Sequence, residues 1–214
     1  MTPSAATPPL PVTAPLALEG VAKTRGEQLF SPVSLMLQEG EGIGVYGHNG
    51  CGKTTLLDIM AGLLRPTHGK VCRAGKIGYV MQHAGFQEQL SFKDNLLLEA
   101  CLCGLSGAAA KRAAEQVAEL CNILPFWKTR YSKGSSGMKG RLGVACALMG
   151  SPQLLLLDEA FNFLDEPAIR HLRLVLRAEK ERGVALVMVS HDREDFAGLC
   201  ERVLHLPDAR IESL

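Results

Sequence analysis

Residues 42–55, GIGVYGHNGCGKTT, decide the fold of this 214-residue chain. The segment begins with a short apolar run, Gly42–Tyr46, of the kind that forms a buried strand. Gly47–Thr54 then satisfies the pattern GxxxxGK[ST], and the apolar spacing behind it predicts a helix from Lys53 to Leu64, stopped by Pro66. Strand, glycine-rich loop and helix in this order predict the phosphate-binding loop (P-loop) of a nucleoside triphosphatase.

The residue types of this loop suit a bound phosphate. Glycines let the backbone curl, so that successive N–H groups and the helix N-terminus point at an anion. We expect Lys53 to reach the β and γ phosphates and the Thr54 hydroxyl to ligate Mg²⁺. A glycine-rich turn without a ligand is the alternative, but it leaves the Lys-Thr pair unexplained. The predicted nucleotide-binding residues here are Gly47, His48, Asn49, Gly50, Cys51, Gly52, Lys53, Thr54 and Thr55.

Cysteine 51 lies inside the loop, where its oxidation would offer a switch on nucleotide binding. The simpler interpretation is that a small side chain is tolerated at this position. The chain has seven cysteines, an odd number dispersed through periodic segments. This usage indicates reduced thiols in a reducing compartment.

A second run, Gln153–Glu159 (QLLLLDE), reads as a buried parallel strand ending in two acids. Ligands bind at the carboxyl ends of the strands in open α/β sheets, so we expect Asp158 beside the P-loop, holding Mg²⁺ through water. Glu159 is placed to orient or deprotonate an attacking water. A solvent-facing acidic turn is the alternative.

Two further strands deliver polar residues at their ends. Val184–Val189 is followed by His191, although spacing alone leaves a structural histidine equally possible. Gln82 follows the predicted strand Lys76–Met81 and is a candidate ligand for Mg²⁺ or the attacking water. A strand-end glutamine without a ligand would look the same.

Composition bounds the partners. The 23 Lys and Arg residues nearly balance the 22 Asp and Glu residues, so net charge gives no reason to expect nucleic acid. No apolar run approaches the roughly 18 residues of a membrane span, so any membrane contact would be indirect. Residues 1–15, rich in Pro, Ala and Thr, predict a flexible tail.

The fold class predicted for the rest is α/β. Leu16–Leu37 suggests short antiparallel strands, and a helix Pro167–Arg182 between two apolar runs restores a strand, helix, strand order. A small hairpin is expected near Val203–Ile211. We predict a P-loop triphosphatase core with a mostly parallel sheet (16–83 and 141–214), an N-terminal antiparallel β portion, and a helical subdomain (84–140).

Taken together, these segments resemble the ATP-binding cassette (ABC) family, the ATPase subunits of ABC transporters. The resemblance covers essentially the whole chain after the tail. GHNGCGKTTLLDIMAGLLRPTHGKV resembles the family's P-loop and its continuation, Gln82 falls on the Q-loop, and LSFKDNL resembles the start of the helical subdomain. LLLLDEAFNFLD resembles the carboxylate strand and D-loop ending at Asp165, and SHD places His191 on the switch histidine.

The family's signature, usually Leu-Ser-Gly-Gly-Gln, has two registers here. Counting back without a gap from Arg141 lays it on 134–138, GSSGM, and makes Ser135, Ser136 and Gly137 nucleotide-binding residues. The rival register uses 131–134, YSKG, with Ser132 as the contacting serine, and needs three extra residues before Met138. We prefer the ungapped one, since an insertion would move the loop away from the helix N-terminus that should face phosphate.

The resemblance implies that two cassettes meet head to tail, so that Ser135 and the Gly137 N–H touch ATP held by the second copy, more simply in a homodimer than in a heterodimer. Ser136 stands where glycine is usual and would be strained at positive φ. Ala160 replaces the usual proline after the glutamate. Val21–Gln28 offers no aromatic residue for adenine, which leaves Arg25 or Phe30 as candidates.

The function implied is the ATP-binding and ATP-hydrolysing subunit of an ABC transporter, with ATP and Mg²⁺ as ligands. Glu159, His191 and Lys53 would be catalytic, and Thr54, Gln82 and Asp158 would hold the metal. ATP-driven dimerisation would move a separate membrane-spanning subunit from the cytoplasmic face of the inner membrane. Short cassettes of this kind resemble exporter subunits, including the haem-export ATPase of cytochrome c maturation. The alternative is a soluble ABC ATPase, such as an iron–sulphur cluster assembly factor.

Overall fold

The computed structural model describes residues 14–81, 85–162 and 164–214. Residues 1–13 of the expected tail and Gln82 therefore lie outside the described residues. Ala14 and Pro15 were also expected in the tail, but both are buried. These two residues therefore belong to the packed part of the described chain.

A six-stranded sheet forms the centre of the described chain, with the strand order β11-β10-β5-β9-β8-β7. Its inner pairs are all parallel, and β11 adds an antiparallel edge. Every residue of β8 and β9 is buried, as expected for strands covered on both faces. The mostly parallel sheet is confirmed. Its strands are β5 (Gly42–Tyr46), β7 (Ile77–Val80), β8 (Leu154–Asp158), β9 (Ala185–Val189), β10 (Arg202–His205) and β11 (Arg210–Ser213).

The antiparallel portion is a second sheet with the order β4-β1-β6. β1 (Leu16–Ala22) and β4 (Val33–Leu37) were expected, and a short hairpin of β2 (Thr24–Arg25) and β3 (Glu27–Gln28) joins them. The third strand, β6 (His68–Arg73), was not predicted. Most of its residues are exposed, so it shows no apolar alternation, and it is held by backbone pairing with β1.

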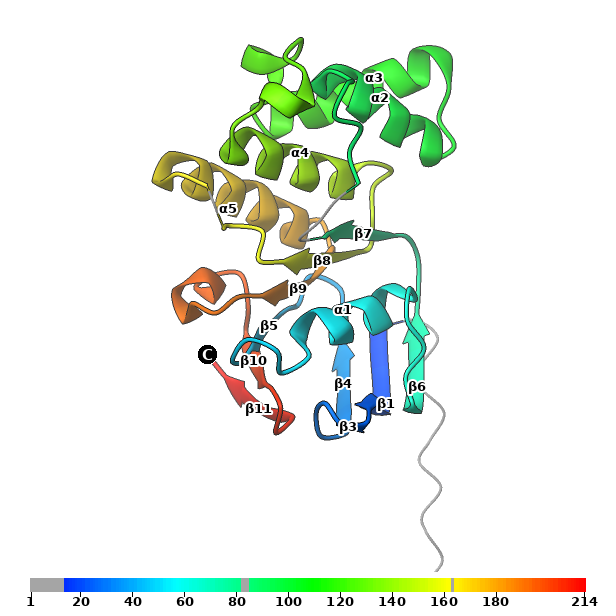
Figure 1. Ribbon diagram of the computed structural model, residues 1–214, viewed down its shortest axis with the longest axis vertical. Coiled ribbons are helices and arrows are strands. Elements are labelled where there is room, and N and C mark those ends of the chain that lie inside the picture. The colour runs from blue at the N-terminus through cyan, green and yellow to red at the C-terminus, as the bar shows by residue number, and fades with distance from the viewer. Residues whose placement is uncertain (1–13, 82–84, 163) are drawn as a thin grey trace, which may run out of the picture.

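Helix α1 (Lys53–Ala61) follows the P-loop and packs between the two sheets (Figure 1). The side chains it buries there are Leu56, Leu57, Ile59 and Met60. The predicted end at Leu64 is wrong: Gly62 adopts φ 84° and its N–H caps the carbonyls of Asp58 and Ile59. Leu63 consequently lies beyond the helix and is 65% exposed, not on the apolar face.

The opposite face of the parallel sheet is covered by α4 (Ser136–Leu148) and α5 (Glu166–Glu181) (Figure 1). A short helix, η3 (Arg193–Phe196), packs beside β5 on this side. A Cβ on Gly78 of β7 would lie 1.9 Å from the carbonyl oxygen of Ala147 on α4. Only glycine therefore permits this close approach between α4 and the sheet.

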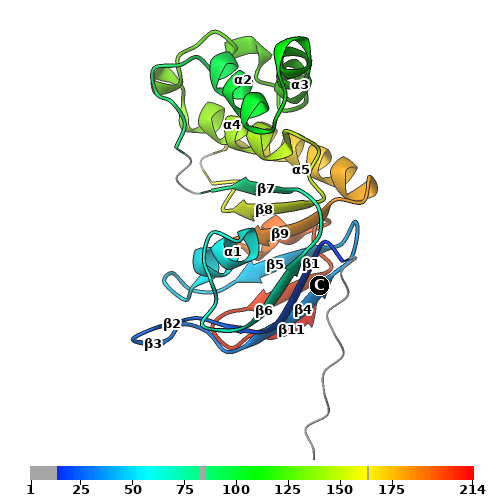
Figure 2. The same ribbon diagram turned by 90° about the vertical axis from the view of Figure 1, so that its right-hand side faces the viewer.

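The helical subdomain lies beyond α4, farthest from the antiparallel sheet (Figure 2). It contains α2 (Phe92–Leu102), α3 (Gly107–Leu120), η1 (Leu124–Phe126) and η2 (Tyr131–Lys133). The expected boundary at 140/141 falls inside α4. This helix packs on α2, α3 and β7. Across residues 14–81, 85–162 and 164–214, no helix combines the length and the apolar character needed to cross a membrane.

Candidate nucleotide-binding site

The P-loop connects the end of β5 to α1 and depends on its glycines. Gly50 and Gly52 adopt φ of 82° and 98°, in the left-handed region that side chains disfavour. A Cβ on Gly52 would also meet the Phe30 ring at 2.8 Å, and one on Gly47 would meet the Leu206 carbonyl oxygen at 2.6 Å. The loop is thus shaped by residues that cannot be replaced without strain, leaving its backbone free to cradle an anion.

The Lys53 side chain is enclosed by this loop and is only 7% exposed. Its Nζ donates to the carbonyl oxygens of Gly47 at 2.7 Å and His48 at 3.1 Å. These bonds use two of the three ammonium protons and hold the charge at the floor of the loop. The structure thus places a buried ammonium group inside the loop, where a positive charge would favour an anion.

Thr54 and Asp158 meet across α1 and β8. The Thr54 hydroxyl donates to Asp158 Oδ2 at 2.8 Å, and Asp158 is only 3% exposed. Burial raises the pKa of Asp158, while the Thr54 hydrogen bond acts in the opposite direction and the Glu159 and Asp58 carboxylates add to the increase. A buried carboxylate beside a hydroxyl is a pair of hard oxygen ligands that fits a small divalent cation.

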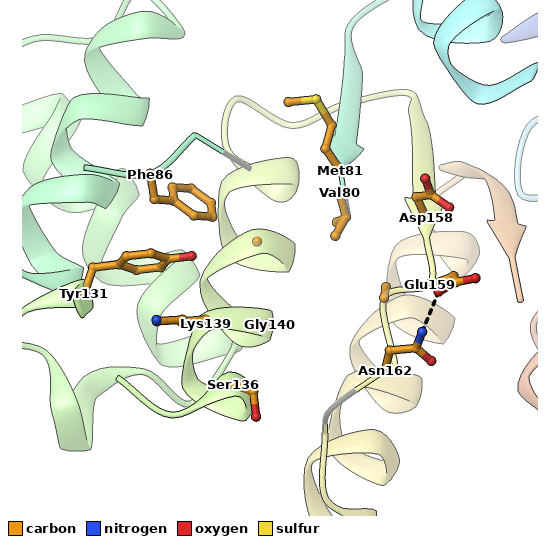
Figure 3. A pocket seen from close by; sticks show the side chains of 12 residues that line it. Val80, Met81, Phe86, Tyr131, Ser136, Lys139, Gly140, Asp158, Glu159 and Asn162 are labelled. Carbon is orange, nitrogen blue, oxygen red and sulfur yellow. Dashed lines mark hydrogen bonds between the residues drawn. The ribbon is translucent and has the colours of Figure 1, made fainter. Parts of the chain in front are cut away.

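Glu159 follows Asp158 and turns the chain at the end of β8. It adopts φ 51°, a strained value for a non-glycine residue, and its N–H donates to the Val189 carbonyl oxygen at 3.1 Å. Asn162 Nδ2 donates to Glu159 Oε2 at 2.6 Å (Figure 3). Asn162 could not be predicted from the sequence, since nothing in an asparagine three residues after the acid distinguishes this contact from a turn.

These elements meet at one pocket of about 440 Å³, lined by Asn49, Gly50, Lys53, Thr54, Glu159 and His191. The pocket joins residues from the P-loop, the end of β8 and the end of β9. Asp158 is linked to the pocket by its hydrogen bond with the Thr54 hydroxyl. Among the other predicted residues, the Cys51 thiol is buried in the core. The structure thus brings together the P-loop lysine, the candidate base and the candidate switch histidine.

The signature residues 135–137 do not line that pocket. Ser136 lines a neighbouring one of about 240 Å³, where Phe86, Tyr131 and Lys139 face the ends of β7 and β8 (Figure 3). Glu159 borders both pockets. Ser136 and the P-loop residues thus line two different pockets, which share Glu159.

The serines of the two candidate registers, Ser135 and Ser132, lie in different local structures. Ser135 is the N-cap of α4, and its Oγ accepts the Met138 N–H at 3.2 Å. Ser132 lies in η2, one turn earlier, with its N–H on the Glu88 carbonyl oxygen. Ser136 begins the helix and is absent from the residues with positive φ, so the strain considered for it is not incurred.

Two residues, Phe30 and Arg25, were candidates for contact with adenine. Phe30 is 1% exposed and its ring packs beneath Gly52 within the core, so the expectation that it reaches a base is wrong. The residue is buried because the P-loop itself covers it. The Arg25 side chain, like Gln82, lies outside the part of the chain that the structure describes.

His191 is exposed at the end of β9, and the residues around it form a hydrogen-bonded turn. The buried Ser190 hydroxyl donates to Asp195 Oδ2 at 2.5 Å and accepts the Asp192 N–H at 2.9 Å. The histidine was a candidate from the sequence, but these supporting contacts were not, because a serine and an aspartate five residues apart carry no recognisable spacing.

Comparison with known proteins agrees with this fold and site. The family model described as ABC transporter matches residues 30–162. The ABC transporter ATP-binding protein YcbN of Bacillus subtilis is 32% identical over 90% of this chain and 66% of its own length. The O-antigen export system ATP-binding protein RfbB of Klebsiella pneumoniae is 30% identical over 90% and 78%, and the spermidine/putrescine import ATP-binding protein PotA of Bacillus cereus is 29% identical over 93% and 65%.

Among solved structures, a dimeric ATP-binding cassette, MJ0796, in a post-hydrolysis state bound to ADP and Pi, superposes with a TM-score of 0.83 at 27% identity. The match covers 93% of this chain and 98% of that one. The fold and site define an ATP-binding cassette, the ATP-hydrolysing unit of its class. The chain belongs to the ABC transporter family, and it spans about two thirds of the length of YcbN and PotA.

Proposed function

We propose that this chain binds ATP with Mg²⁺ and hydrolyses it between two copies of itself arranged head to tail, driving a separate membrane-spanning subunit of an exporter. The observation that carries the proposal is the separation of two half-sites. Lys53, Thr54, Glu159 and His191 border one pocket, whereas the α4 N-terminus with Ser135 lies outside it. A second copy would bring the two half-sites together.

Within the first half-site, each role follows from position. The P-loop backbone and Lys53 would hold the phosphates, with Gly47, His48, Asn49, Gly50, Cys51, Gly52, Thr54 and Thr55 as the remaining contacts. Thr54 and Asp158 would hold Mg²⁺, which when bound neutralises phosphate charge, and Gln82 is proposed as a further ligand. The described residues contain no cluster of three His, Cys, Asp or Glu side chains fit to hold a metal by themselves. That suits an ion which takes its remaining ligands from phosphate and water.

Proton transfer is assigned to Glu159. Its carboxylate borders the pocket, and Asn162 fixes one of its oxygens at 2.6 Å. The other oxygen can accept a proton from water, which is the general-base role that hydrolysis needs. His191 lines the same pocket and would contact the γ-phosphate.

The second half-site is the N-terminus of α4. Backbone N–H groups at a helix start attract anions, and Ser135, Ser136 and Gly137 have small side chains that leave these groups accessible. We propose that they contact ATP held by the partner copy. The dimeric structure of the cassette MJ0796 supports this arrangement.

The proposal also covers the direction of transport and the location of the chain at the membrane. RfbB is described as an export component and PotA as an import component, and both resemble this chain to a similar degree. Export is therefore supported only by the resemblance to short exporter cassettes. We propose a peripheral position on the cytoplasmic face of the inner membrane, with the helical subdomain (84–140) as the docking unit.

Co-purification tests this function. The tagged chain should hydrolyse ATP, and it should be recovered from detergent-solubilised membranes with a multi-span protein. The matched control is Lys53→Ala, which should recover the same partner without turnover. Turnover by a chain that brings down no membrane protein would instead favour a soluble ABC ATPase, such as an iron–sulphur cluster assembly factor.

A further inference from the structure

Arg173, in the middle of α5, contacts two loops that leave the parallel sheet at neighbouring strands. On one side its guanidinium donates to the carbonyl oxygens of Ala197 at 3.0 Å and Glu194 at 2.8 Å, and lies 3.6 Å from Asp195. On the other side its guanidinium carbon lies 5.1 Å from the centre of the Phe161 ring. One side chain therefore bridges the segment after β9 and the segment after β8.

The first contact leads to His191 in two steps. Asp195, whose side chain is 21% exposed like that of Arg173, accepts the hydroxyl of the buried Ser190 at 2.5 Å. The same hydroxyl accepts the Asp192 N–H, so the hydroxyl spans the turn that presents His191. A charge pair that is largely withdrawn from water is screened less than a surface pair, so the attraction between Arg173 and Asp195 favours keeping this turn in place.

The second contact leads to Glu159. Phe161 is buried two residues after Glu159, and its neighbour Asn162 donates to the Glu159 carboxylate. A guanidinium over an aromatic face is attracted by the ring quadrupole, and it also restricts how the ring can move. The Arg173 side chain thus packs against the turn that aims the candidate base.

We propose that Arg173 is a positioning residue that holds the Glu159 turn and the His191 turn in fixed relation to each other. Arg173 does not line the pocket bordered by Lys53, Glu159 and His191, so it would act through these two turns. The inference rests on the proposed function, since it assumes that both turns act on one phosphate. Its effect should fall on the chemical step, because a displacement of about 1 Å in a reacting group can cost on the order of 100-fold in rate.

The next turns of α5 supply a matched control. Arg177 Nε donates to the Gly198 carbonyl oxygen at 3.3 Å, and Lys180 Nζ donates to the Leu199 carbonyl oxygen at 2.7 Å. These contacts hold the same stretch of chain farther from His191. Arg177→Gln therefore removes one arginine and one main-chain hydrogen bond from the same helix face, without reaching Asp195 or Phe161.

The test compares Arg173→Gln, Arg173→Lys and Arg177→Gln in the full chain. We expect Arg173→Gln to lower kcat about tenfold, with KM for ATP and the melting temperature matching those of Arg177→Gln. Arg173→Lys should recover part of kcat, because it keeps the charge near Asp195 but cannot donate to two carbonyls and stack on Phe161 as a planar fork. Equal kcat in Arg173→Gln and Arg177→Gln would overturn the proposal.

A second measurement separates this inference from the proposed function. The histidine ring signals in an NMR spectrum, with His191 assigned from His191→Ala, report the turn whether or not ATP is hydrolysed. Arg173→Gln should shift or broaden the His191 signal, while Arg177→Gln should leave it in place. An unchanged signal in both variants overturns the inference. A wild-type chain without turnover, but with the shift present, overturns the proposed function alone.

Discussion

The P-loop pocket and the N-terminus of α4 are the two half-sites that we propose face phosphate, but they differ in what the chain itself supplies. In the pocket, Lys53 is enclosed by loop carbonyls and Thr54 bonds to Asp158, so the polar groups are already paired. At α4, the Ser135 hydroxyl accepts one N–H and no residue of 135–137 lines the pocket. The first region is a half-site whose polar groups are already ordered by the chain itself. The second is a half-site that, in our proposal, contacts a ligand bound by another copy.

This difference indicates how the proposed catalytic unit is divided between the P-loop pocket and the α4 terminus. In the proposed function, the pocket supplies charge and proton transfer, whereas the α4 terminus supplies backbone dipoles and a hydroxyl. Changes in the first region should therefore affect chemistry with dimerisation preserved. Changes in the second should affect both dimerisation and chemistry while leaving nucleotide binding to the single chain intact.

Replacing the candidate base should give the largest effect. Glu159→Gln keeps the shape and the contact with Asn162 but cannot accept a proton, so we expect ATP turnover to fall by about 10² to 10⁴-fold. ATP binding, measured with a fluorescent analogue, should be unchanged. Glu166→Gln, an exposed carboxylate at the start of α5, is the control and should retain turnover. Full turnover in Glu159→Gln would show that the base lies elsewhere.

The substitution Ser135→Asp tests the role of the α4 N-terminus. Aspartate is a good N-cap, so the helix should stay as stable as in the wild type, but its charge repels phosphate. We expect turnover to drop about 100-fold, the scale seen when one donor to a reacting oxygen is lost, with no loss in melting temperature. Ser132→Asp is the matched control, and it should remain active. The reverse pattern would move the signature to Ser132.

The smallest effect concerns folding and pH. Because burial raises the pKa of Asp158 above 3.8, the folded chain holds that proton more tightly than the unfolded chain does. Ionisation of Asp158 therefore opposes folding. Its contribution to the free energy of unfolding becomes less favourable as the pH rises from the pKa of the unfolded chain to the higher pKa of the folded chain. Asp158→Asn should unfold at higher urea concentration than the wild type at pH 7 without nucleotide. The gain should shrink as the pH falls towards the raised pKa of Asp158, and a variant less stable than the wild type at pH 7 would contradict this expectation.

Much of the fold was predictable because its strands are unambiguous. Leu154–Leu157 and Val184–Val189 are continuous apolar runs, and the glycine pattern at 47–54 permits few other conformations. The strand β6 was missed because its exposed residues carry no alternation. The end of α1 was missed because Gly62, not Pro66, supplies the left-handed cap.

The site was predictable where a motif carried it. Lys53, Thr54, Asp158, Glu159 and His191 were all named from strand ends and loop pattern. Supporting contacts such as those of Arg173 and Asn162 were missed, since they join segments whose proximity follows only from packing. The adenine expectation failed for Phe30 because sequence gives no sign that the P-loop closes over that ring.

The central claim is that the α4 terminus of one copy completes the pocket of another. The most direct measurement is the mass of Glu159→Gln in solution, with and without ATP, beside that of Glu159→Gln/Ser135→Asp. The account predicts that ATP doubles the mass of the first variant and leaves the second monomeric, although both bind the nucleotide equally. Equal ATP-dependent dimerisation of both variants, or a Glu159→Gln chain that binds ATP and stays monomeric, would contradict it.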